Sequence, residues 1–327
     1  MSPSPMAVAH ATARLRLALA AARAARLAWR RVDRDTPGPS WVAALGPVIA
    51  AVAGAQLAAA QSTEPWLEQL LGRDDGKADS DRLNPAALAG VTGDGVPLLT
   101  ALQIPVWTAL SLVTRGVPVV QAMARGQALL DLVVRTAVAD AGRAADSVGM
   151  MARPAVTSYV RVVESGACSR CVVLAGREYG VSTGFARHPR CHCGMEPVTR
   201  EHQPKPTSPK AMYDAMSDAE RRRTFGEAAV KAIDAGADIG FVVNARRGMA
   251  TATAFGRTVQ ATSEQTQRGT FRRREFERLK AEGAIPSSRS IRGFRPQAAR
   301  LMPEEIFRQA EDREHAVRLL RRYGYIF

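Results

Sequence analysis

The sequence predicts an α+β protein that is mainly α-helical. Three observations lead to this prediction: apolar residues recur at helical spacing over roughly the first 150 residues, all four cysteines fall in one 26-residue stretch, and helix-capping signals return after it. We therefore expect an Ala-rich helical region at 1–150, a cysteine-rich β module at 151–200, and a helical region with a basic arm at 201–327.

Size and composition are those of a folded protein with an anionic partner. The chain has 327 residues, of which 46% are apolar and 23% charged, and this excludes wholesale disorder. Lys and Arg number 45 against 31 Asp and Glu, so the net charge is +14 and favours nucleic acid or an anionic membrane surface. The clustered cysteines exclude a disulfide framework spread over the fold and favour a reducing compartment.

The amino-terminal region is expected to be helical. Apolar side chains between Leu15 and Trp29 follow helical spacing, and the arginines among them interrupt the apolar run that a signal peptide needs. The clearest helix passes through Leu130 and Ala141 and ends before Pro154.

Two uncharged stretches, 36–63 and 95–114, reach the length of about 20 residues that a membrane span needs. Ala, Gly and Pro dilute both stretches, and Ala contributes almost nothing to membrane insertion. We expect buried helices there and no membrane span.

The central module carries the strongest chemical signal. Cys168-x-x-Cys171 brings two thiolates to one side of a tight turn, and nineteen residues separate this pair from Cys191-x-Cys193. The intervening chain can run out as one strand, turn near Gly176 and return. This spacing is typical of a zinc ribbon or hairpin, so we expect a small zinc-ribbon-like β module.

Zinc is the metal that this pattern favours, because Zn2+ takes four tetrahedral thiolate and imidazole ligands and thiolates this close repel one another without a cation. We expect Cys168, Cys171 and Cys191 to bind, with Cys193 preferred to His188 for the fourth place. The candidates for the four places are Cys168, Cys171, His188, Cys191, His192 and Cys193. A filled site is structural, because it leaves no position open for water. Reduced cysteines in a small β core, or two local disulfides, are the alternative.

Helical signals return in the carboxy-terminal region, after a proline-rich linker at 201–210. Ser217 and Glu220 form a capping box, and Asp312 can cap a helix near the end of the chain. The apolar run at 239–243 looks like a strand.

Residues 257–300 lack sustained periodicity and are densely basic, which predicts a flexible arm. The segment 268–300 contains ten basic residues and three acidic ones. Such an arm would contact DNA phosphates without reading base sequence, and salt would weaken the contact. The candidate DNA-binding residues are Arg268, Arg272, Arg273, Arg274, Arg278, Arg292 and Arg295. A solvated loop, or an arm neutralised by an acidic partner, is the alternative.

The motifs of several enzyme classes are missing from the sequence. It contains no Gly-x-x-x-x-Gly-Lys-Ser/Thr phosphate loop, no His-Glu-x-x-His and no Gly-x-Ser-x-Gly. The His-x-Glu that a zinc deaminase needs ahead of its cysteines is also missing. We expect no enzymatic activity.

The cysteine motifs resemble the core of the phage Mu F-like minor head proteins, which occur in tailed bacteriophages and prophages. The resemblance rests on the segments Cys168-Ser-Arg-Cys171 and Phe185-Ala-Arg-His188-Pro-Arg-Cys191-His-Cys193. Trp29-Arg-Arg-Val-Asp33 is similar to the amino-terminal helical region of actinobacteriophage members, and 242–249 and 301–326 look like their carboxy-terminal parts.

This resemblance implies a structural, non-enzymatic virion protein. It implies that the chain associates with the portal protein inside the capsid, together with capsid or scaffold proteins, and acts in head assembly and in DNA packaging or delivery. Its expected location is the capsid interior of the virion, and the host cytoplasm during assembly. Double-stranded DNA, bound without sequence preference, is the expected anionic partner.

We expect the amino-terminal helices to carry the portal contact, because Trp29, Trp41 and Trp66 supply large apolar anchors. Packing of these rings in the protein core is the alternative.

The rival function is a zinc-containing nucleic-acid-binding protein or a treble-clef-type nuclease with His188 as general base. Such a nuclease needs a metal with open coordination and a His or Asn after the ligands to orient the phosphate, and only His202 is available.

Overall fold

The chain is mainly helical, with 62% of its residues in helices and 6% in strands, as the sequence predicts. The computed structural model describes residues 3–78, 82–164, 166–184, 188–191, 193–205, 207–246, 249–254, 257–262, 270–292, 294, 300–301, 303–323 and 325–326. The chain divides into two compact units, Met1–Ala167 with Ala175–Thr207, and Cys168–Leu174 with Ser208–Phe327.

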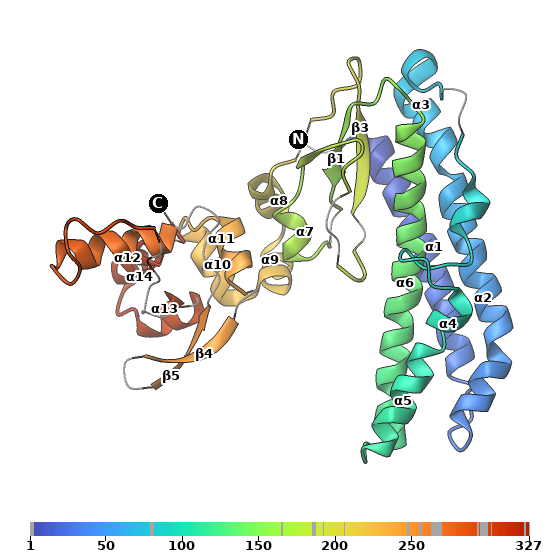
Figure 1. Cartoon of the computed structure of the whole chain (residues 1–327), viewed down its shortest axis with the longest axis horizontal. Coiled ribbons are helices and arrows are strands. Elements are labelled where there is room, and N and C mark those ends of the chain that lie inside the picture. The colour runs from blue at the N-terminus through green and yellow to red at the C-terminus, as the bar shows by residue number, and fades with distance from the viewer. Residues whose placement is uncertain are drawn as a thin grey trace. The chain divides into compact units, whose positions relative to one another are not determined.

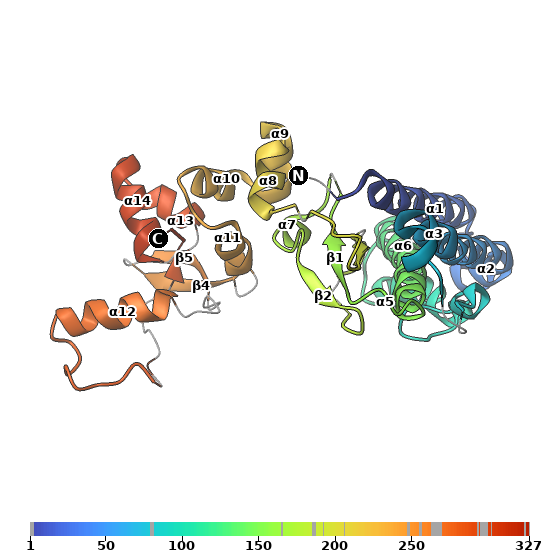
Figure 2. The same ribbon diagram turned by 90° about the horizontal axis from the view of Figure 1, so that it is seen from above.

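The first unit is built around α6 (Val119–Met151), the longest helix, which contacts α1, α2 and α5. α1, α2 and α6 run side by side in Figure 1, and Figure 2 views the same helices nearly end-on. The other helices of this unit are α1 (Pro5–Trp29), α2 (Pro37–Gln61), α3 (Thr63–Asp75), the 3-10 helix η1 (Pro85–Leu88), α4 (Leu98–Ala101) and α5 (Ile104–Thr114). Alanine on α1 and α2 permits close packing, because its small side chain lets the axes of neighbouring helices approach one another.

Three of the four tryptophans lie in this core. Trp29, Trp41 and Trp66 are 4%, 0% and 6% exposed, whereas Trp107 is 50% exposed. The Trp29 indole N–H donates to the Met123 carbonyl at 3.1 Å, which satisfies its polar group inside the bundle. The prediction that Trp29, Trp41 and Trp66 anchor a partner is therefore wrong, because helix packing has already buried their rings.

A glycine on α6 allows two neighbouring segments to approach. A Cβ atom at Gly126 would lie 2.6 Å from Cζ2 of Trp29 and 2.9 Å from the carbonyl oxygen of Pro105. Both distances are shorter than van der Waals contact, so only glycine fits where the Trp29 ring crosses α6.

Among the described residues, Pro37–Asp75 is the one segment that contains a stretch long and apolar enough to cross a membrane. Only 33% of that 18-residue stretch is buried. Trp41, Leu45 and Val52 on α2 nevertheless belong to the core shared with α1 and α6. A core helix of this kind passes the same length test, so the expectation of no membrane span stays a prediction.

The central module contains a small antiparallel sheet in the strand order β2-β1-β3. The strands are β1 (Ser158–Val162), β2 (Glu178–Gly180) and β3 (Gly194–Val198). The zinc-ribbon topology is not confirmed, because the central strand precedes the first cysteine pair instead of lying between the two pairs. That first pair lies at the short helix α7 (Ser169–Val172), which is a single turn with Cys168 at its N-cap.

The second unit contains a further three-stranded antiparallel sheet, β4-β5-β6, with short helices. Its elements are α8 (Pro209–Ala215), α9 (Asp218–Phe225), α10 (Glu227–Asp234), α11 (Ile239–Ala245), β4 (Met249–Ala254), β5 (Arg257–Thr262), α12 (Thr270–Ala281), β6 (Arg300–Leu301), α13 (Pro303–Gln309) and α14 (Arg313–Arg322). The capping box of Ser217 and Glu220 at α9 is confirmed, as is the Asp312 cap of α14.

Two sequence predictions in this unit are wrong. The run at 239–243 is part of helix α11, because the Asp238 side chain accepts a hydrogen bond from the Phe241 N–H at 2.9 Å and starts a helix there. The basic segment expected to be an irregular arm contains strand β5 and the helix α12.

Replacing Gly126 by Ala should lower the free energy of unfolding by about 1–3 kcal/mol, because the added methyl group overpacks the contact with Trp29. Gly54→Ala on α2 is the matched control, since its Cβ would meet nothing within 4 Å. That substitution should stabilise the protein by about 0.5–1 kcal/mol through helix propensity. Urea unfolding of both variants measures the difference, and a Gly126→Ala variant as stable as the wild type would contradict the packing.

Candidate metal centre

Five side chains that can bind metals lie close together in the central module. Cys168, Cys171 and His188 form one group, and Cys171, Cys191 and Cys193 form another, with the ligand atoms of each group within 4.8 Å of one another. Cys171 belongs to both groups, so the ligand atoms of the other four candidates all lie within 4.8 Å of its sulfur. Sulfurs bound to one tetrahedral Zn2+ lie about 3.8 Å apart, given Zn–S bonds of about 2.3 Å. The cluster could therefore bind a metal ion.

Local hydrogen bonds explain how each pair is presented. The Cys171 N–H donates to the Cys168 carbonyl at 2.9 Å, and this turn holds the two side chains three residues apart at α7. The Cys191 N–H donates to the His188 carbonyl at 3.0 Å, which forms a second turn directly before β3. Two tight turns thus present Cys168, Cys171, His188 and Cys191, and Cys193 follows directly before the first residue of β3.

Burial differs among the candidates. Cys171, Cys191 and Cys193 are at most 2% exposed, Cys168 is exposed, and His188 is partly exposed. A metal ion held here would have a dry side and a side open to solvent. His192, the sixth candidate, lies outside the described residues.

The ring of His188 has the tautomer that metal-binding histidines use. Its Nδ1 atom lies 2.7 Å from the Pro189 carbonyl oxygen. A carbonyl can only accept, so Nδ1 carries the proton and Nε2 is the nitrogen suited to a metal ion. This geometry fits the donor set predicted from the sequence.

Two buried arginines contact the Cys191 segment, and sequence reasoning missed both. Arg161 on β1 is 2% exposed, and its Nη2 lies 3.6 Å from Cys191 Sγ. Arg143 on α6 donates to the Cys191 carbonyl at 2.8 Å and pairs with Asp140. Three or four thiolates around one Zn2+ carry a net negative charge, which a buried guanidinium beside the sulfur offsets. Nothing in the local sequence distinguishes these arginines from surface residues.

The loop between His188 and Cys191 is seated on α6 through Arg190. The Arg190 N–H donates to Thr136 Oγ1 at 3.1 Å, and its Nη2 lies 3.1 Å from the Ala128 carbonyl and 3.3 Å from an Asp131 carboxylate oxygen. Arg190 has a φ of 63°, a left-handed conformation that costs a non-glycine residue free energy. These contacts offset that cost and join the loop between His188 and Cys191 to the helical bundle.

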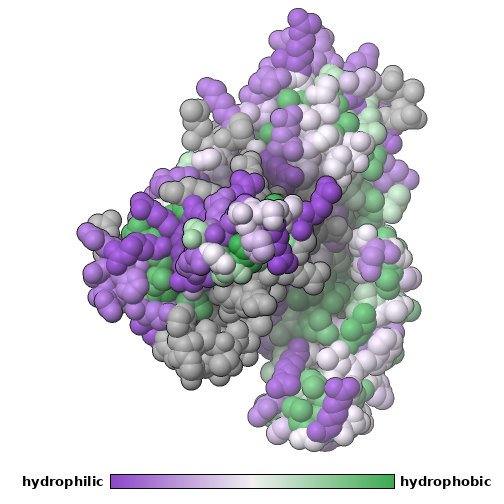
Figure 3. Space-filling view, turned by 60° about the vertical axis from the view of Figure 1, so that its left-hand side comes forward, coloured by the Kyte–Doolittle hydropathy of each residue, from purple (hydrophilic) through white to green (hydrophobic). Residues whose placement is uncertain are grey.

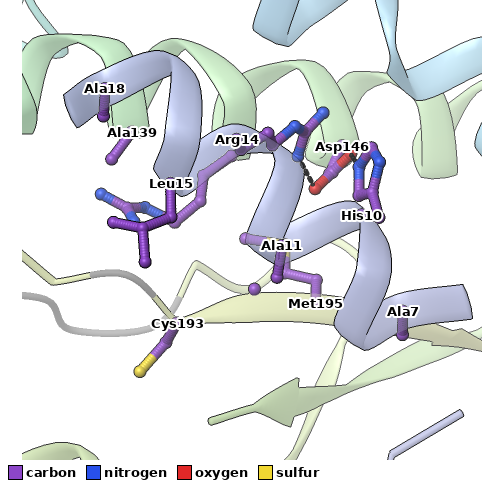
Figure 4. A pocket seen from close by; sticks show the side chains of 12 residues that line it. Ala7, His10, Ala11, Arg14, Leu15, Ala18, Ala139, Asp146, Cys193 and Met195 are labelled. Carbon is purple, nitrogen blue, oxygen red and sulfur yellow. Dashed lines mark hydrogen bonds and ion pairs between the residues drawn. The ribbon is translucent and has the colours of Figure 1, made fainter. Parts of the chain in front are cut away.

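A buried ionic cluster lies beside Cys193 but is separate from the sulfur. Figure 4 shows Arg14 and His10 of α1 around Asp146 of α6, with the Cys193 sulfur pointing away from them. His10 Nε2 lies 3.2 Å from Asp146 Oδ1, and its ring stacks on Trp66 at 4.1 Å between centroids. The adjoining cavity has a volume of about 30 Å³, enough for one or two waters and too small for an organic substrate. The cluster therefore stabilises the helix packing.

The predicted DNA-binding residues divide into three sets. Arg272, Arg273, Arg274 and Arg278 lie on α12, Arg292 lies in the exposed segment after it, and Arg268 and Arg295 lie outside the described residues. Arg278 pairs with Glu275 at 2.7 Å and also with Glu282, so its charge is already neutralised. Arg273 and Arg292 are exposed, which leaves them able to bind an anion.

Acid should destabilise the amino-terminal helices. Burial lowers the pKa of His10 below 6.5, and the Asp146 carboxylate only partly opposes this. Burial alone would raise the pKa of Asp146, but the Arg14 guanidinium and the hydrogen bond from His10 hold that pKa below 3.8. Both groups bind protons more readily in the unfolded chain, so stability is present above pH 6.5 and falls as the pH drops toward the folded pKa values.

The measurement is the Tm of the wild type and of His10→Gln at pH 7.5 and pH 5.5. The wild type should lose more Tm between these pH values, because the variant lacks the group that titrates there. Equal losses would show that His10 does not contribute.

No protein-family model, curated protein or solved structure matches this chain. The assignment of the candidate centre therefore rests on the residues of this chain alone.

Proposed function

We propose that this chain is a structural, non-enzymatic minor head protein of a tailed bacteriophage or prophage, of the phage Mu F-like kind. The observation that supports this proposal is the Cys/His cluster, because it joins the two segments that carry the resemblance to that family. In this proposal the protein associates with the portal inside the capsid and contacts the packaged double-stranded DNA.

The cofactor of the cluster, in this proposal, is one structural Zn2+. Cys168, Cys171 and Cys191 would hold it together with Cys193 or His188, and the ion would neutralise the mutual repulsion of the thiolates. The protein's own residues orient the ligands: Arg161 lies beside the Cys191 sulfur, and Arg143 holds the Cys191 carbonyl. Such a site fastens the loop that is seated on α6.

The portal contact would use side chains other than the buried tryptophans. Ile104 and Trp107 on α5 are 41% and 50% exposed, and Leu99 on α4 is 54% exposed. Exposed aromatic and aliphatic side chains are the usual anchors of protein interfaces. This apolar face of α4 and α5 is therefore the surface that we assign to the portal.

Protein purified without chelator should contain one Zn2+ per chain by elemental analysis. Arg161→Met should weaken zinc binding about 10–100-fold in a chelator competition, because the neutral side chain no longer offsets the thiolate charge. Arg177→Met is the control, since this exposed guanidinium lies over the Tyr179 ring, 5.4 Å from its centroid. A zinc-to-protein ratio near zero in soluble, monodisperse protein would overturn the zinc assignment.

Replacing Ile104 and Trp107 together by Ser should reduce co-purification with the portal protein of the same phage at least tenfold, because both anchors are lost. Val42→Ser on α2, a residue 56% exposed, is the control and should leave co-purification unchanged. Retained portal binding in the double variant would refute this surface. Cleavage of DNA with Mg2+ or Mn2+, abolished by His188→Ala, would instead favour the nuclease.

A further inference from the structure

We infer that the second unit binds the phosphates of duplex DNA through a folded surface formed by α12 and the carboxyl end of α14. This surface consists of Arg273, Arg321 and Arg322, and we call it the α12/α14 face. The inference rests on the proposed contact with packaged DNA and replaces the flexible arm by a defined site.

Arg274 joins the two helices. Its Nη1 atom donates to the Ile326 carbonyl at 3.0 Å and also to the Arg321 carbonyl. The basic helix α12 is therefore held against the carboxyl end of α14, and the two helices are in contact. This link is the reason to expect that arginines of α12 and α14 contact the same ligand.

The buried side of each helix shows which arginines remain at the surface. Leu320 and Tyr323 on one side of the α14 end are 0% and 3% exposed, and the intervening Arg321 and Arg322 are exposed. On α12, Phe276 is buried against Phe294, and Arg273 is exposed. Figure 3 turns this end of the molecule toward the viewer, and most of its described atoms there are hydrophilic.

Ion pairing leaves this face positively charged. Arg278 is neutralised by Glu275 and Glu282, and Arg318 lies 3.9 Å from Glu314. Within the described part of the chain, no carboxylate forms an ion pair with Arg273, Arg321 or Arg322. Their charges are thus available to an external anion.

The ordinary role of arginine at a helix end does not account for this arrangement. Basic side chains in a last turn usually interact with the final carbonyl groups and with the helix dipole. Here the Arg274 guanidinium of α12 donates a hydrogen bond to the Arg321 carbonyl. This carbonyl therefore needs no hydrogen bond from the guanidiniums of α14 itself.

The chemistry of the face favours duplex DNA over a lipid surface. A membrane-binding face needs exposed apolar side chains that enter the bilayer beside its basic ones. The large exposed hydrophobic side chains among the described residues all lie between Leu19 and Met151, in the first unit. The Arg322 guanidinium lies over the Tyr323 ring, 5.6 Å from its centroid, but that ring is itself buried. Guanidiniums whose large apolar neighbours are buried instead suit a phosphate backbone, which they bind by releasing counterions.

The experiment measures binding of the full-length protein to a random 30-base-pair duplex over a series of salt concentrations. The test variant combines Arg273→Gln, Arg321→Gln and Arg322→Gln. Loss of three phosphate contacts should reduce the slope of log K against log salt by about 2–3 units and weaken binding at least tenfold at 0.1 M salt.

The control variant removes the same charge elsewhere in the unit, by Lys210→Gln, Arg222→Gln and Arg223→Gln, which are all exposed positions. The control should keep the wild-type slope to within about one unit. A similar loss in both variants would show that net charge alone binds DNA, and an unchanged slope in the test variant would remove the face from the interaction; either result overturns the inference.

Two further readings separate this inference from the proposed function. The test variant should still bind the portal and retain zinc, so failure of DNA binding alone would leave the minor head assignment intact. Anionic vesicles of phosphatidylcholine and phosphatidylglycerol provide the remaining comparison. Vesicle binding that is stronger than duplex binding and lost in the test variant would identify a membrane surface and overturn the DNA assignment.

Discussion

The packing of the helical unit depends on the compensation of one buried charge, the Asp146 carboxylate on α6. Arg14 of α1 pairs with it, and Thr63 at the start of α3 donates to it at 3.2 Å. The Arg14 guanidinium also donates to the Ala59 carbonyl at the end of α2. Four helices thus meet at one ion pair, and removal of one partner from such a pair typically costs about 3–5 kcal/mol. The pair therefore fixes the register of helices whose alanine faces could otherwise slide past one another.

Helix α6 connects this bundle to the cysteine-rich loop. Its bundle side carries Gly126 against Trp29, and its other contacts hold the loop through Thr136 and Arg143. The loop also includes Arg190, whose left-handed backbone conformation persists because α6 satisfies its N–H and its side chain. Order in the loop between His188 and Cys191 and order in the bundle are consequently linked through one helix. A metal bound at the loop would stabilise the helical unit as well as the module itself.

The net charge of +14 conceals two different uses of arginine. Arg153 and Arg161 are 1% and 2% exposed, and they satisfy internal groups: Arg153 donates to the Gly76 carbonyl at 2.8 Å and pairs with Glu64. Only exposed arginines that lack a carboxylate neighbour can act on a polyanion. Composition therefore indicates an anionic partner, but the three-dimensional structure decides which side chains could meet it.

The sequence by itself determined the features that depend on local chemistry. The α6 periodicity, the capping box of Ser217 and Glu220, and the tight turn between Cys168 and Cys171 all involve residues whose interactions lie within a few positions. The tertiary structure decided the rest: the apolar run at 239–243 is helical, three of the four tryptophans are buried, and Arg161 lies beside the Cys191 sulfur. A short apolar run fits a strand or a helix equally well, and burial of a side chain depends on elements distant in sequence. Local patterns carry no information about those distant neighbours.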